Sequence, residues 1–263
     1  MTASKAYLDT TVFTDALLKR DSRGDSARAA LKRYSQTILP VYAIKEFKAG
    51  PLQYFVYLHN KLLTTKSVAA TLAALSAIGR SQPNRSQTAG TALSNLMRAF
   101  GDMALTDTQA ADTYRSAIAR IIISSWRKRR KITSKVSEEL TCYSEADPVI
   151  AIRTGLFENP GVNCALYGTQ ECCLAIGLKG RGKDLDALVK AIQGQNRRED
   201  DNRRGVLRKL LNTPKRPMDA GDCRKLGDAY FALHAPSDAV ILTTNLKDHA
   251  RLANALGKRV EAP

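Results

Sequence analysis

The chain has 263 residues, 44% hydrophobic and 25% charged, which is typical of a globular protein with either one large domain or a core carrying an insertion. Forty-one Lys and Arg against 25 Asp and Glu give a net charge of +16 and a pI near 9.8, which favours nucleic acid, ahead of an acidic membrane surface, as partner. No window approaches the roughly 18 apolar residues of a membrane span, and the N-terminus lacks a basic region followed by an apolar block, so neither a membrane protein nor a secreted protein is expected.

Short strands and helices alternate at the start of the chain. Ala6–Leu8 predicts a strand, Asp15–Arg20 and Ser26–Tyr34 predict helices, and Thr37–Val41 predicts a second strand. The first strand stops at Asp9, which two threonines follow. This arrangement fits a turn that caps the next helix, and it also fits a carboxylate placed to hold a metal ion.

The middle of the chain, from Pro51 to about Pro217, is mostly helical in pattern. Apolar residues recur at helical spacing over Leu52–Leu63, Lys66–Ile78, Thr91–Phe100, Thr108–Ile132 and Asp184–Ile192. Loops are expected over Ser81–Gly90, Glu158–Gly161 and Gly177–Lys183, and a boundary at Thr213–Pro217. Gln195–Arg204 is nearly devoid of apolar residues and predicts an exposed loop or a frayed helix.

A basic segment lies inside this region. Eight basic residues and no acid occur between Arg115 and Lys135, and the segment ends in WRKRRKI (Trp126–Ile132). Such a helix would contact backbone phosphates without reading sequence, and the predicted contacts are Arg127, Lys128, Arg129, Arg130 and Lys131. A solvated or partner-facing helix is the alternative. Trp126 would either stack on an unpaired base or belong to the core, and the core is the commoner place for a lone Trp.

The end of the chain repeats the alternation seen at its start. Asp228–Ala235 predicts a helix, Ala239–Thr243 a buried strand, Lys247–Leu256 a helix and Lys258–Glu261 an edge strand. This alternation predicts an α/β fold, a parallel sheet flanked by helices. The predicted core comprises residues 1–50 and 218–263. A mostly helical insertion, residues 51–217, must also contain the third strand of the sheet.

Four acidic residues fall at comparable positions of this expected sheet. Asp9 ends the first strand, and Glu46 lies in the helix after the second. Asp228 opens the helix before the last buried strand, and Asp248 follows that strand. Because helix starts and strand ends share the edge where such sheets bind ligands, we expect the four carboxylates to meet there. Taken one at a time, each acid also fits a helix cap, a surface position or a first helical turn.

Clustered carboxylates repel one another unless a cation compensates them. Mg²⁺ and Mn²⁺ prefer oxygen ligands, so acids without His or Cys are the appropriate set, and two such ions can drive phosphodiester hydrolysis. Thr10 and Asn245 would add neutral oxygen contacts or orient the acids. Asp222 is a rival to Asp228, and Asp238 is a further acid nearby in sequence.

Four motifs around these acids resemble those of the PIN-domain nucleases. They are LDTTVF at Asp9, LPVYAIKEFKAG at Glu46, LGDAYFALHA at Asp228 and ILTTNLKDH at Asp248. The family consists of metal-dependent enzymes, mostly ribonucleases, and includes the toxins of bacterial toxin–antitoxin pairs. The resemblance implies a PIN-like sheet with the four acids as ligands of the catalytic metal. The chain departs from the family pattern at Thr11, where Asn is frequent, and at His249, where Phe is common.

The expected function is therefore that of a cytoplasmic, Mg²⁺- or Mn²⁺-dependent endoribonuclease that uses metal-activated water. A toxin or defence role, with an antitoxin or other protein as partner, follows from the resemblance. The alternatives are a flap-type or single-strand DNA nuclease and a non-catalytic RNA-binding subunit.

The cysteines and histidines suggest no site of their own. The five cysteines are odd in number and irregularly spaced, which favours reduced thiols in a cytosolic protein over a zinc site. Structural roles are expected for His59, His234 and His249.

Overall fold

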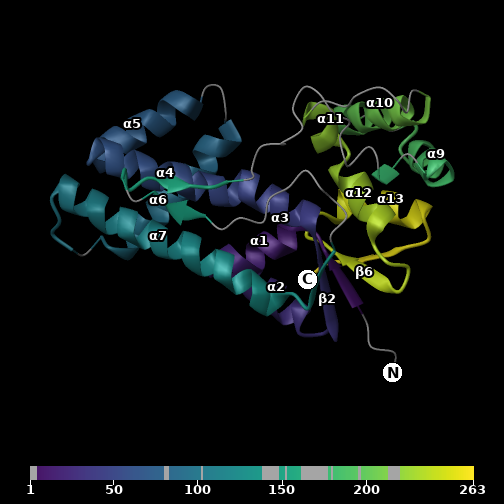
Figure 1. Cartoon of the computed structure of the whole chain (residues 1–263), viewed down its shortest axis with the longest axis horizontal. Helices are drawn as coiled ribbons and strands as arrows, with labels where there is room; N and C mark the ends of the chain where they lie inside the picture. The colour runs from purple at the N-terminus through teal and green to yellow at the C-terminus, as the bar shows by residue number, and fades with distance from the viewer. Residues whose placement is uncertain are drawn as a thin grey trace. The chain divides into compact units, whose positions relative to one another are not determined.

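The protein is described from a computed structural model (Figure 1). The structure describes residues 5–79, 83–101, 103–137, 148–151, 153–160, 177–178, 180–194, 197–212 and 220–263. The boundary predicted at Thr213–Pro217 and four of the five cysteines lie outside these residues. Cys223 is buried and is not part of a disulfide. Among the helices described here, none is long and apolar enough to cross a membrane.

A five-stranded parallel sheet forms the centre of the fold, in the order β3-β2-β1-β6-β7. Its strands are β1 (Lys5–Leu8), β2 (Gln36–Pro40), β3 (Lys135–Ser137), β6 (Ala239–Leu242) and β7 (Arg259–Glu261). The strands β1 and β6 are almost wholly apolar and buried along their length, as expected of central strands covered on both faces. The predicted α/β fold with a parallel sheet and flanking helices is confirmed.

The strand that the sequence left unplaced is β3. It pairs with β2 in parallel, with Leu39 opposite Val136. Thr37 of β2 holds the segment just before β3 in place. Its hydroxyl donates to the Ile132 carbonyl at 2.9 Å, and its amide donates to the Ser134 hydroxyl at 3.2 Å. Three residues make a weak sequence signal, so the partner strand defines this element more than its own composition does.

The chain divides into two compact units. The first consists of residues 1–45, 130–144 and 163–263, and the second of residues 46–129 and 145–162. The division falls within α3 (Val41–Phe47) and near the end of α7 (Asp107–Ile132). It differs from the predicted boundaries at residues 50 and 218, because β3 and the helices after residue 180 pack with the sheet unit.

Seven helices of the described chain belong to the first unit. They are α1 (Thr10–Leu18), α2 (Ser22–Leu31), α9 (Gly182–Ala191), α10 (Arg198–Asn212), α11 (Ala220–Lys225), α12 (Gly227–His234) and α13 (Leu246–Ala255). Helix α10 packs on α9 and α11, and α12 packs on α13 (Figure 1). Helix α10, with its acidic start, therefore belongs to the same group of packed helices as α12 and α13.

Helix α10 corrects the prediction of a loop or frayed helix over Gln195–Arg204. Asp200 and Arg203 are buried in it, and Val206, Leu207 and Leu210 supply an apolar face further along. Three acids in the first turn favour the helix, because they face its positive end. The pairs of Asp200 with Arg203 and of Asp201 with Arg204 add support at i,i+3 spacing.

The second unit is mostly helical, with a short antiparallel ribbon. It contains the π-helical turn η1 (Lys48–Leu52), α4 (Gln53–Thr65), α5 (Val68–Gly79), α6 (Pro83–Ala99), most of α7, and the strands β4 (Val149–Ile150) and β5 (Phe157–Glu158). From Pro83 on, helix α6 replaces the loop predicted over Ser81–Gly90, since a proline at the first helical position is compatible with a helix start.

Trp126 belongs to the core of the second unit. The side chain is buried, with the Arg129 guanidinium 3.9 Å and the Lys48 ammonium 5.0 Å from the ring centroid. Lys48 is itself buried and donates to the Pro160 carbonyl at 2.5 Å. Two cations over one indole make a cation–π arrangement. Of the two roles considered for Trp126, the core position is the one observed.

Candidate functional site

The first acid of the site, Asp9, directly follows β1. Its amide donates to the Leu242 carbonyl at 3.0 Å, which continues the pairing of β1 with β6 by one residue. One carboxylate oxygen, Oδ2, accepts from Thr11 Oγ1 at 2.5 Å and from Thr243 Oγ1 at 2.7 Å. Although Asp9 is the N-cap residue of α1, its side chain makes no capping bond. The carboxylate is thus directed to the carboxyl edge of the sheet, between two strands.

The segment after β6 positions Asp248. The Asn245 amide donates to Thr243 Oγ1 at 2.9 Å, so the threonine that bonds Asp9 also fixes the turn into α13. The Asn245 side chain then donates to Asp248 Oδ2 at 2.8 Å. Asp248 Oδ1 lies 2.8 Å from Arg197 Nη1. The carboxylate of Asp248 is therefore held by an amide on one oxygen and a guanidinium on the other.

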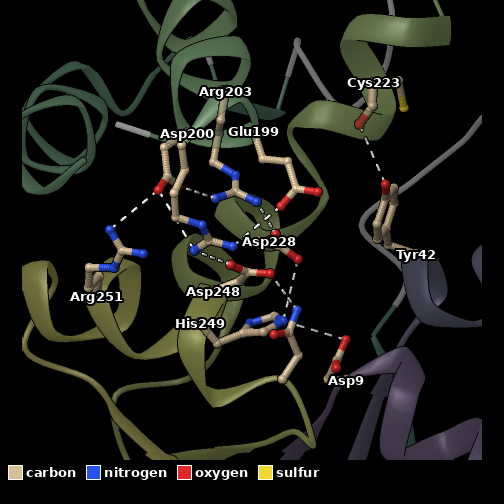
Figure 2. A network of polar contacts seen from close by, with 12 residues as sticks. Asp9, Tyr42, Glu199, Asp200, Arg203, Cys223, Asp228, Asp248, His249 and Arg251 are labelled. Atoms are coloured by element: carbon tan, nitrogen blue, oxygen red, sulfur yellow. Dashed lines mark hydrogen bonds and ion pairs between the residues drawn. The ribbon is translucent and has the colours of Figure 1, made fainter. Parts of the chain in front are cut away.

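His249 connects Asp9 with Asp228, which lies in the first turn of α12. The imidazole Nε2 is 3.7 Å from Asp9 Oδ1 and 3.4 Å from Asp228 Oδ1 (Figure 2). The ring is buried and packs edge-on against Phe231, with 5.6 Å between centroids. A nitrogen between two carboxylates favours the tautomer with its proton on Nε2. Sequence reasoning gave His249 a structural role, and the signal it missed was the adjacency to Asp248.

The surroundings shift the pKa values of two aspartates in opposite directions. Loss of water on burial raises the pKa of Asp228 above its ordinary value, and Arg203 and His249 offset only part of this effect. Burial opposes ionisation of Asp248 as well. There, however, the hydrogen bond from Asn245 and the contact with Arg197 outweigh it and lower the pKa. Asp248 is therefore the acid more firmly held in its ionised form.

Helix α10 and the residue just before it bring a buried acid and two arginines that the sequence did not predict for this site. Arg203 pairs with Asp228 through Nη2 and with Asp200 through Nη1, the latter at 3.1 Å (Figure 2). Arg197, just before the helix, pairs with Asp248. The one available signal was the spacing of Arg197, Asp200 and Arg203, since side chains three residues apart share a helix face.

The fit of this site to a divalent cation depends on the oxygens that face a common point. Asp9 Oδ1 and Asp228 Oδ1 both face His249 Nε2, while their Oδ2 atoms bond to threonines and to Arg203. Within the described residues, no group of three or more His, Cys, Asp and Glu is close enough to enclose a metal ion. The donors are nevertheless hard oxygens of the kind that Mg²⁺ and Mn²⁺ accept. We regard the chemistry of Asp9, Asp228 and Asp248 as compatible with such an ion.

Two other predicted contributors are Glu46 and Thr10. Glu46 is half-buried on α3 and is the first residue of the second unit, whereas the site above is built from the first unit alone. Thr10 begins α1, and the hydroxyls that bond Asp9 are those of Thr11 and Thr243. The roles of Glu46 and Thr10 stay predictions.

The two rival acids are accounted for elsewhere. Asp222 lies on α11 and pairs with Lys209 at 2.5 Å and Lys225 at 3.6 Å. Asp238 precedes β6, is 58% exposed and pairs at 2.5 Å with Lys5, the first residue of β1. That places Asp238 at the amino end of the parallel strands, opposite to Asp9. The suggestion that Asp238 is an additional acid near the site is wrong.

The basic segment of α7 is mostly exposed. Arg127, Lys128, Arg130 and Lys131 present their side chains to solvent. Arg129 is the exception, because it is buried over the Trp126 ring and donates to the Trp126 carbonyl at 3.2 Å. We therefore remove Arg129 from the predicted nucleic-acid contacts, whereas the other four remain available to a ligand.

Comparison of the chain with models of protein families, with curated proteins and with solved structures found no match.

Proposed function

We propose that this protein is a Mg²⁺- or Mn²⁺-dependent nuclease that hydrolyses RNA phosphodiester bonds. The observation that carries the proposal is the meeting of Asp9 and Asp228 at the carboxyl edge of a parallel sheet, with one oxygen of each facing the same nitrogen of His249. The net charge of +16 supports a polyanionic substrate. The motifs that resemble those of PIN-domain nucleases agree with this chemistry and add Glu46 as a fourth ligand.

In this proposal Asp9, Asp228 and Asp248 are the metal ligands that the first unit supplies. A bound ion supplies activated water and charge stabilisation for the leaving oxygen. The hydroxyls of Thr11 and Thr243 keep one oxygen of Asp9 occupied, so that its other oxygen stays directed into the site. Asn245 likewise occupies one oxygen of Asp248, and the other oxygen, which is paired with Arg197, would turn to the ion. A toxin or defence role with an antitoxin partner, in the cytoplasm, rests on the family resemblance alone.

The ion pairs of the site favour one second candidate. Because Arg203 and Arg197 already neutralise Asp228 and Asp248, the fold could persist without a metal ion. The second candidate is therefore a non-catalytic RNA-binding subunit whose acids serve only in ion pairs.

The test is incubation of the purified protein with a labelled RNA pool and a matched single-stranded DNA pool, with Mg²⁺, Mn²⁺ or EDTA. We expect RNA cleavage in both metals and none in EDTA. Asp9→Asn should slow cleavage at least about 100-fold, since it removes a ligand charge and keeps the shape. The matched control is Asp238→Asn, an acid at the opposite end of the strands, and it should cleave like wild type. Faster cleavage of DNA would establish the DNA-nuclease alternative, and equal activity of the Asp9 variant would overturn the site.

A further inference from the structure

Three arginine side chains converge on the buried carboxylate of Asp200. The Asp200 side chain is 2% exposed, and Arg203 Nη1 donates to its Oδ1 at 3.1 Å. Its other oxygen lies 3.4 Å from Arg251 Nη1 and 3.8 Å from Arg197 Nη1 (Figure 2). A planar guanidinium fixed by a buried carboxylate has little freedom left to lose when it binds a further anion. Asp200 therefore holds arginine groups in fixed positions beside the acidic cluster.

Two of these arginines reach the carboxylates of the proposed metal site. Arg203 bonds Asp228 and Arg197 bonds Asp248. The Arg203 side chain is 9% exposed, and its Nε has no hydrogen-bond partner among the described residues. A buried donor without a partner costs free energy, and an oxygen of an anionic ligand would satisfy it.

The carboxylates of the cluster outnumber its guanidinium groups by one. The carboxylates of Asp9, Asp200, Asp228 and Asp248 face the guanidinium groups of Arg197, Arg203 and Arg251. Four carboxylates and three guanidinium groups leave one net negative charge among these side chains. One divalent cation turns this into one net positive charge, which a single phosphodiester anion neutralises. The arginines are thus in excess only once a metal ion is bound, and the site then attracts phosphate.

We propose that Arg197 and Arg203 bind the phosphate at the position of cleavage, and that Asp200 positions them for it. This inference rests on the proposed function. Guanidinium groups suit the task because they donate two parallel hydrogen bonds to phosphate oxygens. When the carboxylates of Asp228 and Asp248 turn to a metal ion, the same N–H groups become available to the substrate. The proposal makes RNA binding at this site dependent on the divalent cation.

The experiment compares Arg197→Gln and Arg203→Gln with Arg204→Gln. Arg204 is a matched control for Arg197, because it carries the same charge, is similarly exposed, lies in the helix that directly follows Arg197 and pairs with Asp201 instead of the cluster. The probe is a fluorescently labelled single-stranded RNA oligonucleotide, measured by anisotropy with Ca²⁺ and with EDTA, and checked on a gel for intactness. Circular dichroism and thermal melting report whether each variant is folded. Arg197→Gln is the decisive variant if Arg203→Gln, which removes a partner from both Asp228 and the buried Asp200, does not fold.

We expect Ca²⁺ to tighten RNA binding by wild type and by Arg204→Gln alike. In Ca²⁺, Arg197→Gln should bind RNA about tenfold more weakly than wild type, which is the range of one charge-assisted hydrogen bond. In EDTA, the variant and wild type should bind RNA equally. In cleavage assays with Mn²⁺, its KM should rise. An equal loss in Arg204→Gln would mean that only overall charge matters and would overturn the proposal, and so would unchanged binding by Arg197→Gln.

These outcomes are separate from the fate of the proposed function. If wild type cleaves RNA and Arg197→Gln does so with an unchanged KM, the phosphate assignment is wrong and the nuclease function stands. If no RNA is cleaved although Ca²⁺-dependent binding is lost in Arg197→Gln alone, the phosphate site stands and the nuclease function is wrong.

Discussion

His249 Nε2 lies 3.4 Å from Asp228 Oδ1, and the same nitrogen is 3.7 Å from Asp9 Oδ1. One imidazole therefore separates the two carboxylates that the proposed function needs most. As an N–H donor, the ring reduces their mutual repulsion without a metal ion. Its other nitrogen, Nδ1, is buried and has no hydrogen-bond partner in the described part of the chain. The aromatic contact with Phe231 keeps the ring in place.

Replacement of His249 by Phe tests this separation, because Phe preserves the ring and removes the donor. We expect a lower melting temperature in EDTA and a larger rise on addition of millimolar Mn²⁺, since the cation then offsets repulsion that the imidazole no longer offsets. Thermal melting of both proteins with and without Mn²⁺ gives the two shifts. A smaller rise in the variant would show that the imidazole is itself a metal ligand.

Asp200→Asn should destabilise the protein strongly. The change leaves the buried Arg203 and its neighbours without their shared counter-ion, and breaking a buried pair in this way typically costs about 3–5 kcal/mol. Asp201→Asn is the control, since Asp201 is 53% exposed and its pair with Arg204 should contribute under about 1 kcal/mol. Urea unfolding of the two variants measures both free energies. A similar loss of unfolding free energy in both variants would mean that Asp200 acts by stabilising the start of the helix. It would then not act by holding the arginines.

Thr243→Val should weaken the hold on Asp9 while keeping side-chain shape. The variant removes a buried hydroxyl that donates to Asp9 Oδ2 at 2.7 Å and accepts from the Asn245 amide. A hydrogen bond to a charged group contributes about 1.5–3 kcal/mol, so we expect a loss of stability in that range and a weaker response to Mn²⁺. Thr244→Val, one residue on and exposed, should behave like wild type in urea unfolding and in metal titration.

The carboxyl edge could be predicted from sequence because parallel strands end at one edge by geometry. Asp9 and Thr243 follow β1 and β6, strands recognisable from short apolar runs, and their side chains meet at 2.7 Å. Asn245 was singled out for the same reason and bonds Asp248. The prediction required only the order of elements, not their packing.

Helix α10 could not be predicted in the same way. Its first turns carry almost no apolar residue, and composition alone suggested an exposed segment. What buries Asp200 is a set of ion pairs, one of them with Arg251 on α13, about fifty residues away. Partners so distant in sequence leave no periodic signal. A burial that depends on charge pairing is therefore visible only once the helices are packed.

The raised pKa of Asp228 predicts a pH dependence of stability. Because burial raises the pKa above the ordinary value of 3.8, the folded state holds the proton more tightly than the unfolded chain. The contribution of this carboxyl to stability is therefore full below that value and is lost as the pH rises through the folded pKa. In EDTA, Asp228→Asn should therefore gain stability relative to wild type as the pH rises above 3.8 toward neutral. Urea unfolding at several pH values checks this, and a constant difference between the two proteins would contradict it.

The exposed part of the basic segment and its buried member, Arg129, can be separated by substitution. If α7 binds phosphates, RNA binding should depend less on salt in the triple variant Arg127→Gln, Lys128→Gln and Arg130→Gln. The slope of the logarithm of the RNA-binding constant against the logarithm of salt concentration should fall by roughly 0.7 for each lost contact with single-stranded RNA. Turnover at saturating RNA should survive, because the acidic cluster is built from other elements. Arg129→Gln removes one charge from the same helix but from a buried position over Trp126. It should instead lower stability by roughly 0.5–2 kcal/mol, the scale of a cation–π contact, and leave the salt slope unchanged.

RNA titrations at several salt concentrations, with the triple variant, Arg129→Gln and wild type side by side, distinguish these outcomes. A slope that stays the same in the triple variant would assign the exposed face of α7 to a protein partner or to solvent. A slope that falls in Arg129→Gln as well would mean that this side chain leaves the Trp126 ring to meet the nucleic acid. Because the two sets of residues share one helix and differ in burial, the comparison attributes RNA binding to exposed charge, and not to the basic composition of the segment.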